Sequence, residues 1–319
     1  MSTLSRFPIR ILSEIWSSAN RTARYARDRG WISSRKFSTP TIGIGNVQAG
    51  GAGKTPLTIR LAQDALAKGL QVAVLTRGYR GAWESTGGIL SPEEPPASPE
   101  LCGDEAALIR DQAPGVWIGV GADRIRQFET LESNVLLRTG RKFDLVLLDD
   151  AYQHWKIRCD QYVVAVTDSV FGDQLFRDEY SVISPDDVVV LTKGGTFPAA
   201  LAEYPKQVRT RYRYTVRDRR VQYRFVTAIA DPERARAALE EAGFTIVDMT
   251  AFPDHHFFSR AEVGKILEEA LQNDLRVLVT GKDWVKWRAL GISPNEVEVV
   301  EPVVEIFEGQ VIWNALLPE

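Results

Sequence analysis

The stretch "GNVQAGGAGKTP" (residues 45–56) decides the fold, because it joins the apolar run "TIGIG" (41–45) to the helical pattern "TPLTIRLAQDALAKG" (55–69). A strand, a glycine-rich loop and a helix in this order are typical of a phosphate-binding loop. Gln48 stands where the usual pattern G-x-x-x-x-G-K-[ST] has its first glycine. The pair Gly50–Gly51 can supply the turn instead, because glycine accepts backbone angles that other residues avoid. We therefore expect a nucleotide site rather than a glycine-rich turn without a ligand.

The loop residues have distinct expected roles. Lys54 can reach the β- and γ-phosphates of ATP, and the Thr55 hydroxyl can bind Mg²⁺. The following helix begins near Pro56, which suits a first helical turn, and its positive end would face the phosphates. The expected ATP-binding residues are Gly50, Gly51, Ala52, Gly53, Lys54, Thr55 and Pro56.

Outside this loop, short apolar runs alternate with helical patterns along the chain. Such alternation predicts an α/β fold, here a P-loop NTPase-like three-layer sandwich with a mainly parallel sheet. Ligands of these folds bind at the carboxyl ends of the strands. The expected strands are 41–45, 72–76, 116–120, 144–148, 162–167 and 187–192.

The chain is expected to have four regions. They are a basic N-terminal region (1–36), a nucleotide-binding domain (37–205), a β-ribbon linker (206–224) and a smaller α/β domain (225–319). The ribbon is predicted from "VRTRYRYTVRDRRVQYR", whose Val, Tyr and Arg residues alternate. The segment 81–100 is rich in Pro, Gly and Ser, so we expect a long surface loop that is either filler or a lid.

Two pairs of adjacent acids lie where a phosphate site would need them. Asp149 and Asp150 follow the apolar run 144–148, as a metal-holding carboxylate should. They could also cap the next helix, but the GKT sequence of the loop favours metal binding. Asp104 and Glu105 open a helical pattern, and by themselves they indicate no more than a helix N-terminus.

Composition limits the classes of function. The 319 residues carry a net charge of −3, so no nucleic-acid partner is expected. Two cysteines and three scattered histidines exclude a disulfide framework and do not resemble a structural zinc site. The stretch "FPDHHFF" (252–258) nevertheless places Asp254, His255 and His256 on an expected loop, where they can orient a base or bind a metal.

The N-terminal region has two possible interpretations. No run of about 18 apolar residues is present, so no transmembrane segment is expected. Residues 1–36 hold eight Arg and Lys residues against two acids, and Ile9, Leu12, Ile15 and Trp16 fall at helical spacing. A basic amphipathic helix can lie on an anionic membrane. The alternative is a helix that packs on the domain with a solvated basic face. The segment alone favours this second interpretation.

Taken together, the motifs resemble the tetraacyldisaccharide 4′-kinase family of lipid A biosynthesis in Gram-negative bacteria. The resemblance extends from about residue 35 to about residue 290. The loop of this family characteristically lacks the first glycine, so Gln48 fits it. The matching motifs, in family order, are "GNVQAGGAGKTP" (45–56), "LTRGYRG" (75–81), "GDEAAL" (103–108), "GADRI" (121–125), "LDDAYQH" (148–154), "FPDHH" (252–256) and "VTGKDWVKW" (279–287).

The resemblance implies an activity and a location. The family has two α/β domains joined by a β-ribbon, and an N-terminal helix that meets the lipid substrate. It therefore reverses the preferred interpretation of residues 1–36. The implied reaction transfers the γ-phosphate of ATP to the 4′-hydroxyl of a tetraacyldisaccharide 1-phosphate, a lipid A precursor. We expect a peripheral or monotopic monomer on the cytoplasmic face of the inner membrane.

The resemblance also implies residue roles. Lys54 would hold the phosphates, Asp104 would accept the hydroxyl proton, and His255 would reach across the cleft to tune Asp104. The implied metal ligands are Thr55, Asp149 and Asp150. The implied substrate-binding residues are Arg77, Arg124, Glu105, Gln153 and His154. For Arg77 and Arg124 a structural salt bridge is an equal alternative.

Two departures from the family pattern leave other functions open. The family usually has a segment like "LLPAGPLREP", where this chain reads "VTDSVFGDQLFRDEYSVIS" (166–184) with Arg177 and Asp178 or Glu179 as its remnant. Gly281 stands where the family usually has Glu. A divergent kinase with another acceptor is one alternative. A P-loop NTPase switch or metallochaperone is another, although the signature lysine of dimeric ATPase switches would fall at Ala49.

Overall fold

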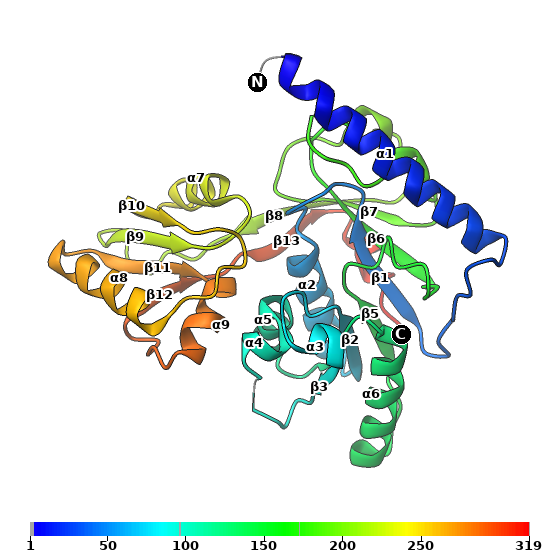
Figure 1. Ribbon diagram of the computed structural model, residues 1–319, viewed down its shortest axis with the longest axis horizontal. Coiled ribbons are helices and arrows are strands. Elements are labelled where there is room, and N and C mark those ends of the chain that lie inside the picture. The colour runs from blue at the N-terminus through cyan, green and yellow to red at the C-terminus, as the bar shows by residue number, and fades with distance from the viewer. Residues whose placement is uncertain (1–2, 96, 172, 319) are drawn as a thin grey trace.

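The computed structural model describes residues 3–95, 97–171 and 173–318. Residues 1–2 of the expected N-terminal region, residue 96 of the expected surface loop, and residues 172 and 319 lie outside this description. The described chain forms a nine-stranded sheet and a separate four-stranded sheet, each covered by helices (Figure 1).

The larger sheet has the strand order β13-β8-β7-β6-β1-β5-β2-β4-β3. Its strands pair in parallel except at the two edges, where β13 and β3 run antiparallel to their neighbours. The bounds are β1 Thr41–Asn46, β2 Val72–Thr76, β3 Gly88–Leu90, β4 Trp117–Val120, β5 Leu145–Leu148, β6 Gln161–Val166, β7 Val188–Leu191, β8 Gln207–Arg213 and β13 Val303–Glu308.

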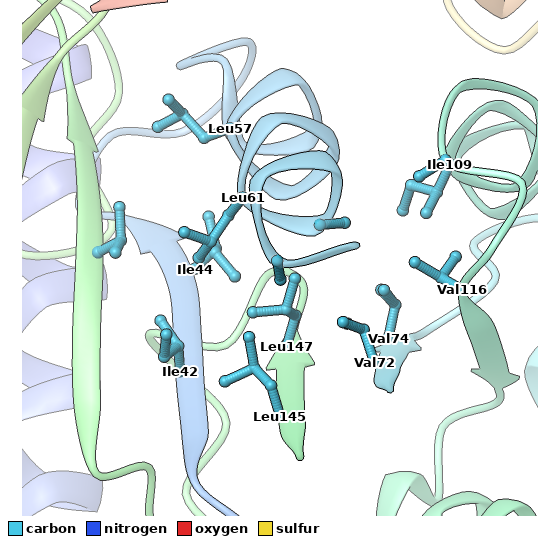
Figure 2. Close-up of a cluster of buried hydrophobic side chains, with 14 of the residues drawn as sticks. Ile42, Ile44, Leu57, Leu61, Val72, Val74, Ile109, Val116, Leu145 and Leu147 are labelled. Atoms are coloured by element: carbon cyan, nitrogen blue, oxygen red, sulfur yellow. The ribbon is translucent and has the colours of Figure 1, made fainter. Parts of the chain in front are cut away.

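Both faces of this sheet are covered, which explains the continuous apolar runs of its strands. On one face, Leu57 and Leu61 of α2 (Lys54–Ala67) pack on alternate residues of β1, β5 and β2 (Figure 2). On the other face, Leu75 and Leu148 pack with α6 (Arg124–Thr139). All six strands expected from the sequence are present, each end within one residue. The expected three-layer α/β fold is confirmed.

The remaining helices of the larger unit lie around the sheet. Helix α1 (Thr3–Asp28) crosses its outside next to the segment that joins β6 to β7 (Figure 1). No described helix, α1 included, has the length and apolar character needed to cross a membrane. The others are α3 Trp83–Thr86, α4 Pro99–Cys102, α5 Asp104–Gln112 and α10 Gln310–Asn314, with 3₁₀ turns at Tyr180–Val182 and Ala199–Leu201.

The smaller sheet is entirely parallel, with the order β10-β9-β11-β12. Its strands are β9 Gln222–Thr227, β10 Thr245–Ala251, β11 Arg276–Thr280 and β12 Val297–Val300. Helices α7 (Pro232–Ala242), α8 (Arg260–Gln272) and α9 (Gly281–Ala289) cover it. Capping fixes where two of them begin: Ser259 and Glu262 form a capping box on α8, and Thr280 caps α9.

The connection between the two units differs from the β-ribbon linker expected over 206–224. Strand β8 belongs to the larger sheet and β9 to the smaller one, so the two do not pair. The ribbon that links the units consists of β8 and β13, which pair antiparallel from Val303 opposite Arg213 to Glu308 opposite Arg209. The alternation of side chains predicted a ribbon strand correctly, but its partner lies about 90 residues away and carries no local signal.

Two further boundaries differ from the sequence expectation. The segment 81–100 is not a plain loop, because it contains α3, the edge strand β3 and the first part of α4. The expected smaller domain, 225–319, ends too late: β13 and α10 return to the larger sheet, where Trp313 is fully buried in the main core. The chain therefore crosses between the two units twice, and β8 lies beside the phosphate loop, where Tyr212 is next to Gly53.

Candidate active site

The phosphate loop has the geometry that its sequence predicts. Gly50 and Gly53 have φ of 87° and 84°, values that glycine adopts without strain, and Gly53 is the residue before the first turn of α2. The side-chain amide of Asn46 donates to the carbonyl oxygens of Gln48 and Gly50 and so closes the loop on the end of β1. The loop amides therefore precede a helix N-terminus, which is a favourable position for an anion.

Gln48 has a structural role that accounts for its place in the loop. Its side chain is fully buried and makes two bonds to Thr167 at the end of β6. The amide Nε2 donates to Thr167 Oγ1 at 2.9 Å, and Oε1 accepts from the Thr167 backbone N–H at 3.1 Å. A glycine could make neither bond. The residue that breaks the usual pattern therefore fixes the loop to the neighbouring strand.

Asp149 and Asp150 lie where β5 ends, beside the loop. Asp149 is buried and accepts from Thr58 Oγ1 of α2 at 2.9 Å. Asp150, with φ of 49°, has Oδ1 3.5 Å from Lys54 Nζ and 3.3 Å from Arg177 Nη1. Burial, and then the charge of Asp150, raise the pKa of Asp149. Burial would also raise the pKa of Asp150, but Lys54 and Arg177 outweigh it and lower that pKa.

The two units of the chain meet at Asp104 and His255. Asp104 opens α5 in the larger unit, and His255 follows β10 in the smaller one. His255 Nδ1 lies 2.9 Å from Asp104 Oδ2. Since an ionised carboxylate only accepts hydrogen bonds, this contact places a proton on Nδ1. The structure thus brings together two residues that are 151 positions apart in the sequence.

Two lysines of α9 surround the same carboxylate. Lys282 Nζ lies 3.7 Å and Lys286 Nζ 3.6 Å from Asp104 Oδ2. Burial alone would raise the pKa of Asp104, but the hydrogen bond from His255 and the charge of Lys282 outweigh it and hold that pKa below its usual value. Both lysines belong to the motif "VTGKDWVKW", in which no local pattern distinguishes them from ordinary helix residues. They lie near Asp104 because α9 packs against α5.

The other residues expected at the site lie in two groups. Glu105 lines the cleft, and burial together with the charge of Asp149 raises its pKa to about 7. Arg124 is buried and donates to the carbonyl oxygen of Asp150 at 3.3 Å, while its Nε has no hydrogen-bond partner among the described residues. Both therefore line the cleft that contains the phosphate loop, and Arg124 has unused bonding capacity there.

Three other expected substrate-binding residues, Arg77, Gln153 and His154, have roles other than an open binding contact in the cleft. Arg77 lines the cleft but pairs with Glu84 at 2.7 Å, so the salt-bridge alternative describes its observed contact. Gln153 donates to the backbone oxygen of Asn46 and to the carboxylate of Asp178, both at 3.0 Å. It therefore holds the end of β1, just before the phosphate loop, rather than lining the cleft. Burial, and then the charge of Arg124, lower the pKa of His154 to about 4, so His154 is neutral at pH 7.

A cleft of about 1350 Å³ joins these elements. One wall is the phosphate loop and α2, the other is α7 with His255 and Lys282, and the ribbon strands β8 and β13 form the floor. Such a volume accommodates a nucleotide together with part of a second substrate. The phosphate loop lies on one wall, and His255, whose ring contacts Asp104 of the larger unit, lies on the other. This arrangement is suited to phosphoryl transfer.

Comparison with known proteins agrees with this geometry. The family model of tetraacyldisaccharide-1-P 4′-kinases matches residues 5–317. This chain belongs to that family. The kinase class expected from the sequence, ATP-dependent and of lipid A biosynthesis, is thereby confirmed.

Individual members of the tetraacyldisaccharide 4′-kinase family show the extent of the similarity. The kinase of Chromobacterium violaceum is 30% identical over 287 residues, which cover 82% of this chain and 78% of that protein. The kinase of Allorhizobium ampelinum is 34% identical over 267 residues, covering 79% and 73%. A crystal structure of LpxK from Aquifex aeolicus in complex with ATP has the same fold, with a TM-score of 0.73, 21% identity and 97% of both chains covered.

One departure from the pattern of this kinase family has a structural explanation. Gly281 begins α9, and a Cβ atom there would coincide with the carboxylate of Glu301, at the end of β12. Glu301 lines the cleft, and its Oε1 is buried with no hydrogen-bond partner among the described residues. This chain therefore places a carboxyl group from β12 in the space that a side chain at position 281 would fill.

Proposed function

We propose that this kinase uses Asp104 as the base for the 4′-hydroxyl of a tetraacyldisaccharide 1-phosphate and holds ATP on the loop 50–56. The observation that supports this most is the Asp104–His255 contact at the edge of the same cleft that the phosphate loop lines. Asp104 would accept the hydroxyl proton as the hydroxyl oxygen attacks the γ-phosphorus. His255 would keep the carboxylate oriented, and Lys282 and Lys286 would keep it ionised.

The phosphates would be held by groups that already point to the loop. Lys54 Nζ is free to exchange its contact with Asp150 for phosphate oxygens, and Arg124 offers an unused Nε. Charge-assisted bonds of this kind position a transferring phosphoryl group and stabilise its charge. A base must come within about 3 Å of the hydroxyl, so the two units would close further around both substrates.

The residues around Asp149 and Asp150 fit Mg²⁺. Two adjacent carboxylates raise the energy of the ionised site, as the raised pKa of buried Asp149 shows, and a cation would relieve this. The described residues include no group of three or more His, Cys, Asp or Glu side chains that could hold a metal alone. Mg²⁺ commonly takes one or two carboxylates and completes its shell with phosphate oxygens and water. Bound through Thr55 and these acids, it would neutralise phosphate charge.

Helix α1 would place the kinase on the anionic cytoplasmic face of the inner membrane. Its buried side is polar, because Ser13 and Ser17 are 0% and 1% exposed, whereas Leu12 and Ile15 are 55% and 62% exposed. A helix that simply packed on the domain would show the reverse pattern. Its exposed apolar face, flanked by arginines, fits the interfacial region of a membrane. This favours the membrane-surface interpretation of residues 1–36 over a helix that only packs on the domain.

One assay tests the proposed roles. The protein and its Lys54→Ala, Asp104→Ala and His255→Ala variants are incubated with labelled ATP, Mg²⁺ and tetraacyldisaccharide 1-phosphate in detergent. We expect labelled lipid from the wild type and a loss of at least about 100-fold in the Asp104 variant. An absence of labelled lipid from the wild type at any enzyme concentration would refute the acceptor. ATP hydrolysis stimulated by a protein partner would instead support the switch or metallochaperone. The expected monomer is tested by the molar mass of the detergent-solubilised protein from light scattering.

A further inference from the structure

Lys193 lies beside the phosphate loop, and no salt bridge joins it to another residue that the structure describes. It follows β7 by two residues, lines the cleft, and its Nζ would lie 3.3 Å from a Cβ atom placed at Gly51. Across the described residues, no carboxylate or hydrogen-bond acceptor contacts this ammonium group. Burial, and then the positive charge of Arg234, lower the pKa of Lys193, and the charge of Asp231 offsets this only in part. A partly buried cation without a partner is costly unless a ligand supplies the opposite charge.

The backbone around Lys193 is fixed to the phosphate loop. The hydroxyl of Thr192 donates to the carbonyl oxygen of Ala52 at 2.8 Å, and its backbone N–H donates to Val166. Lys193 itself has φ of 62°, a left-handed conformation that is uncommon outside glycine. The chain therefore holds this residue in a strained turn whose effect is to direct the ammonium group toward the loop.

A second cation approaches from the opposite wall. Arg234 lies in the first turn of α7, in the smaller unit, where its backbone N–H binds the capping side chain of Asp231. Its guanidinium Nη2 donates to the carbonyl oxygen of Lys193 at 3.4 Å. This is the one polar contact of that guanidinium in the described chain, and no acid pairs with it. Arg234 thus reaches from the smaller unit to the backbone of Lys193, the residue that lies beside the phosphate loop of the larger unit.

We propose that Lys193 and Arg234 form a second cation pair for the polyphosphate of ATP, in addition to Lys54. Lys193 binds the phosphates in the open cleft, because its backbone is anchored to the loop. Arg234 adds its bonds as the smaller unit closes, since α7 carries it across the cleft. Nucleotide charge would then relieve the repulsion among three cations and couple ATP binding to closure. This inference rests on ATP being the phosphoryl donor, as in the proposed function.

The test measures nucleotide affinity without the lipid acceptor. Lys193→Gln, Lys193→Arg and Arg234→Gln are titrated with a fluorescent non-hydrolysable ATP analogue and Mg²⁺, and inorganic tripolyphosphate is used as competitor. Lys193→Gln should weaken binding of both probes about 10-fold, because each loses one charge-assisted bond. Lys193→Arg keeps the charge, so it should recover at least half of the lost binding free energy, which corresponds to a Kd within about threefold of the wild type. Arg234→Gln should lower kcat for lipid phosphorylation more than it weakens analogue binding.

Two substitutions serve as controls. Lys206→Gln removes a half-buried lysine of the same unit that binds the backbone of Asp186, and Arg236→Gln removes an arginine of α7 that pairs with Glu240. Both should bind the analogue as the wild type does. A Lys193→Gln variant with a Kd within twofold of the wild type for both probes would overturn the inference. If instead the wild type binds ATP but labels no lipid, the acceptor assignment fails while the cation pair stands.

Discussion

Arg177 Nη1 lies 3.3 Å from Asp150 Oδ1, and the same guanidinium lies over the ring of Trp16 in α1, 5.8 Å from its centre. Arg177 is also tied to the end of β1, because its backbone N–H donates to the carbonyl oxygen of Val47 at 2.7 Å. The Asn20 side chain of α1 donates to the Arg177 carbonyl at 2.9 Å. One residue therefore contacts the exposed helix, the start of the phosphate loop and the acid expected at the metal.

This relationship predicts that Arg177→Ala impairs catalysis. Without its guanidinium, Asp150 loses a charge partner and Lys54 is left to neutralise it, so Lys54 is less available to phosphate. We expect kcat to fall roughly 5- to 20-fold, the effect of one partly buried charged hydrogen bond. Steady-state kinetics in mixed micelles measure this change.

The matched control for Arg177 is Arg21→Ala. Arg21 joins α1 to the same segment through Glu179 at 3.0 Å, but both side chains are exposed. Such a surface pair contributes about 0–1 kcal/mol, so its loss should leave kcat within twofold. Equal effects of the two substitutions would show that α1 docking alone, and not the contact with Asp150, controls the rate.

The pH dependence of the reaction should respond to His255. The hydrogen bond from His255 and the charge of Lys282 hold the pKa of Asp104 below its usual value against the effect of burial. His255→Ala removes one of these stabilising contacts with the ionised form, so the pKa of Asp104 must rise. The acid limb of the kcat/KM profile should therefore move to higher pH, in addition to a loss of about 10²–10⁴-fold at the plateau.

A merely structural role of His255 would not move the acid limb. The Asp104→Ala/His255→Ala double variant should be no slower than Asp104→Ala alone, because the two residues act as one unit. Additive losses, with an unchanged acid limb in His255→Ala, would contradict the proposed pair.

Sequence patterns predicted the parts of this protein that local chemistry determines. Gly50 and Gly53 identify the phosphate loop because only glycine takes their backbone angles at no cost. The apolar runs gave the strands of the larger sheet, since burial on both faces leaves no polar positions. Asp149 and Asp150 could be placed because a parallel strand ends at the ligand edge of its sheet.

Long-range pairing carried the information that the sequence lacked. The partner of β8 is β13, and nothing near either strand indicates this. Lys282 and Lys286 act on Asp104 only because α9 packs against α5. Glu301, the residue after β12, occupies the space beside Gly281 at the start of α9. In each case the deciding contact joins two elements whose separate patterns are ordinary.

Glu301 should make the stability of the protein depend on pH. Burial, and then the charges of Asp111 and Asp283, raise the pKa of Glu301 to about 8. In the unfolded chain this carboxyl ionises near pH 4–5, so the unfolded state is favoured increasingly as pH rises from there to about 8, and the cost is constant above that. Glu301→Gln removes the ionisation. The variant should therefore be more stable than the wild type. We expect the difference between their free energies of unfolding to increase by about 2 kcal/mol from pH 5 to pH 8, as measured by urea unfolding. An equal gain at both values would show that ionisation of this carboxyl is not the cause.

Gly281→Ala should destabilise the protein, although alanine normally favours a helix. The new methyl group would coincide with the Glu301 carboxylate, and overpacking of this kind costs about 1–3 kcal/mol. Glu301→Ala should rescue the variant by vacating the space, so the double variant should melt close to Glu301→Ala alone. If Gly281→Ala melts at the wild-type temperature, the two positions do not compete for one space. Gly264→Ala in α8, where an added Cβ meets no atom within 4 Å, is the control for the change itself.

Leu12→Glu should weaken membrane binding without affecting the fold. Leu12 is 55% exposed on the apolar side of α1, whereas the opposite side holds the buried Ser13 and Ser17. With α1 as the proposed membrane contact, replacing this leucine removes about 1.5–3 kcal/mol of apolar transfer and adds a negative charge that anionic lipids repel. Partition to vesicles with anionic lipid should fall at least about 10-fold in a flotation assay, and Tm should stay unchanged. Leu137→Glu is the matched control, because Leu137 is 86% exposed on α6, away from α1 (Figure 1). If both variants lost partition equally, charge on any surface would be the cause and α1 would not be the membrane contact.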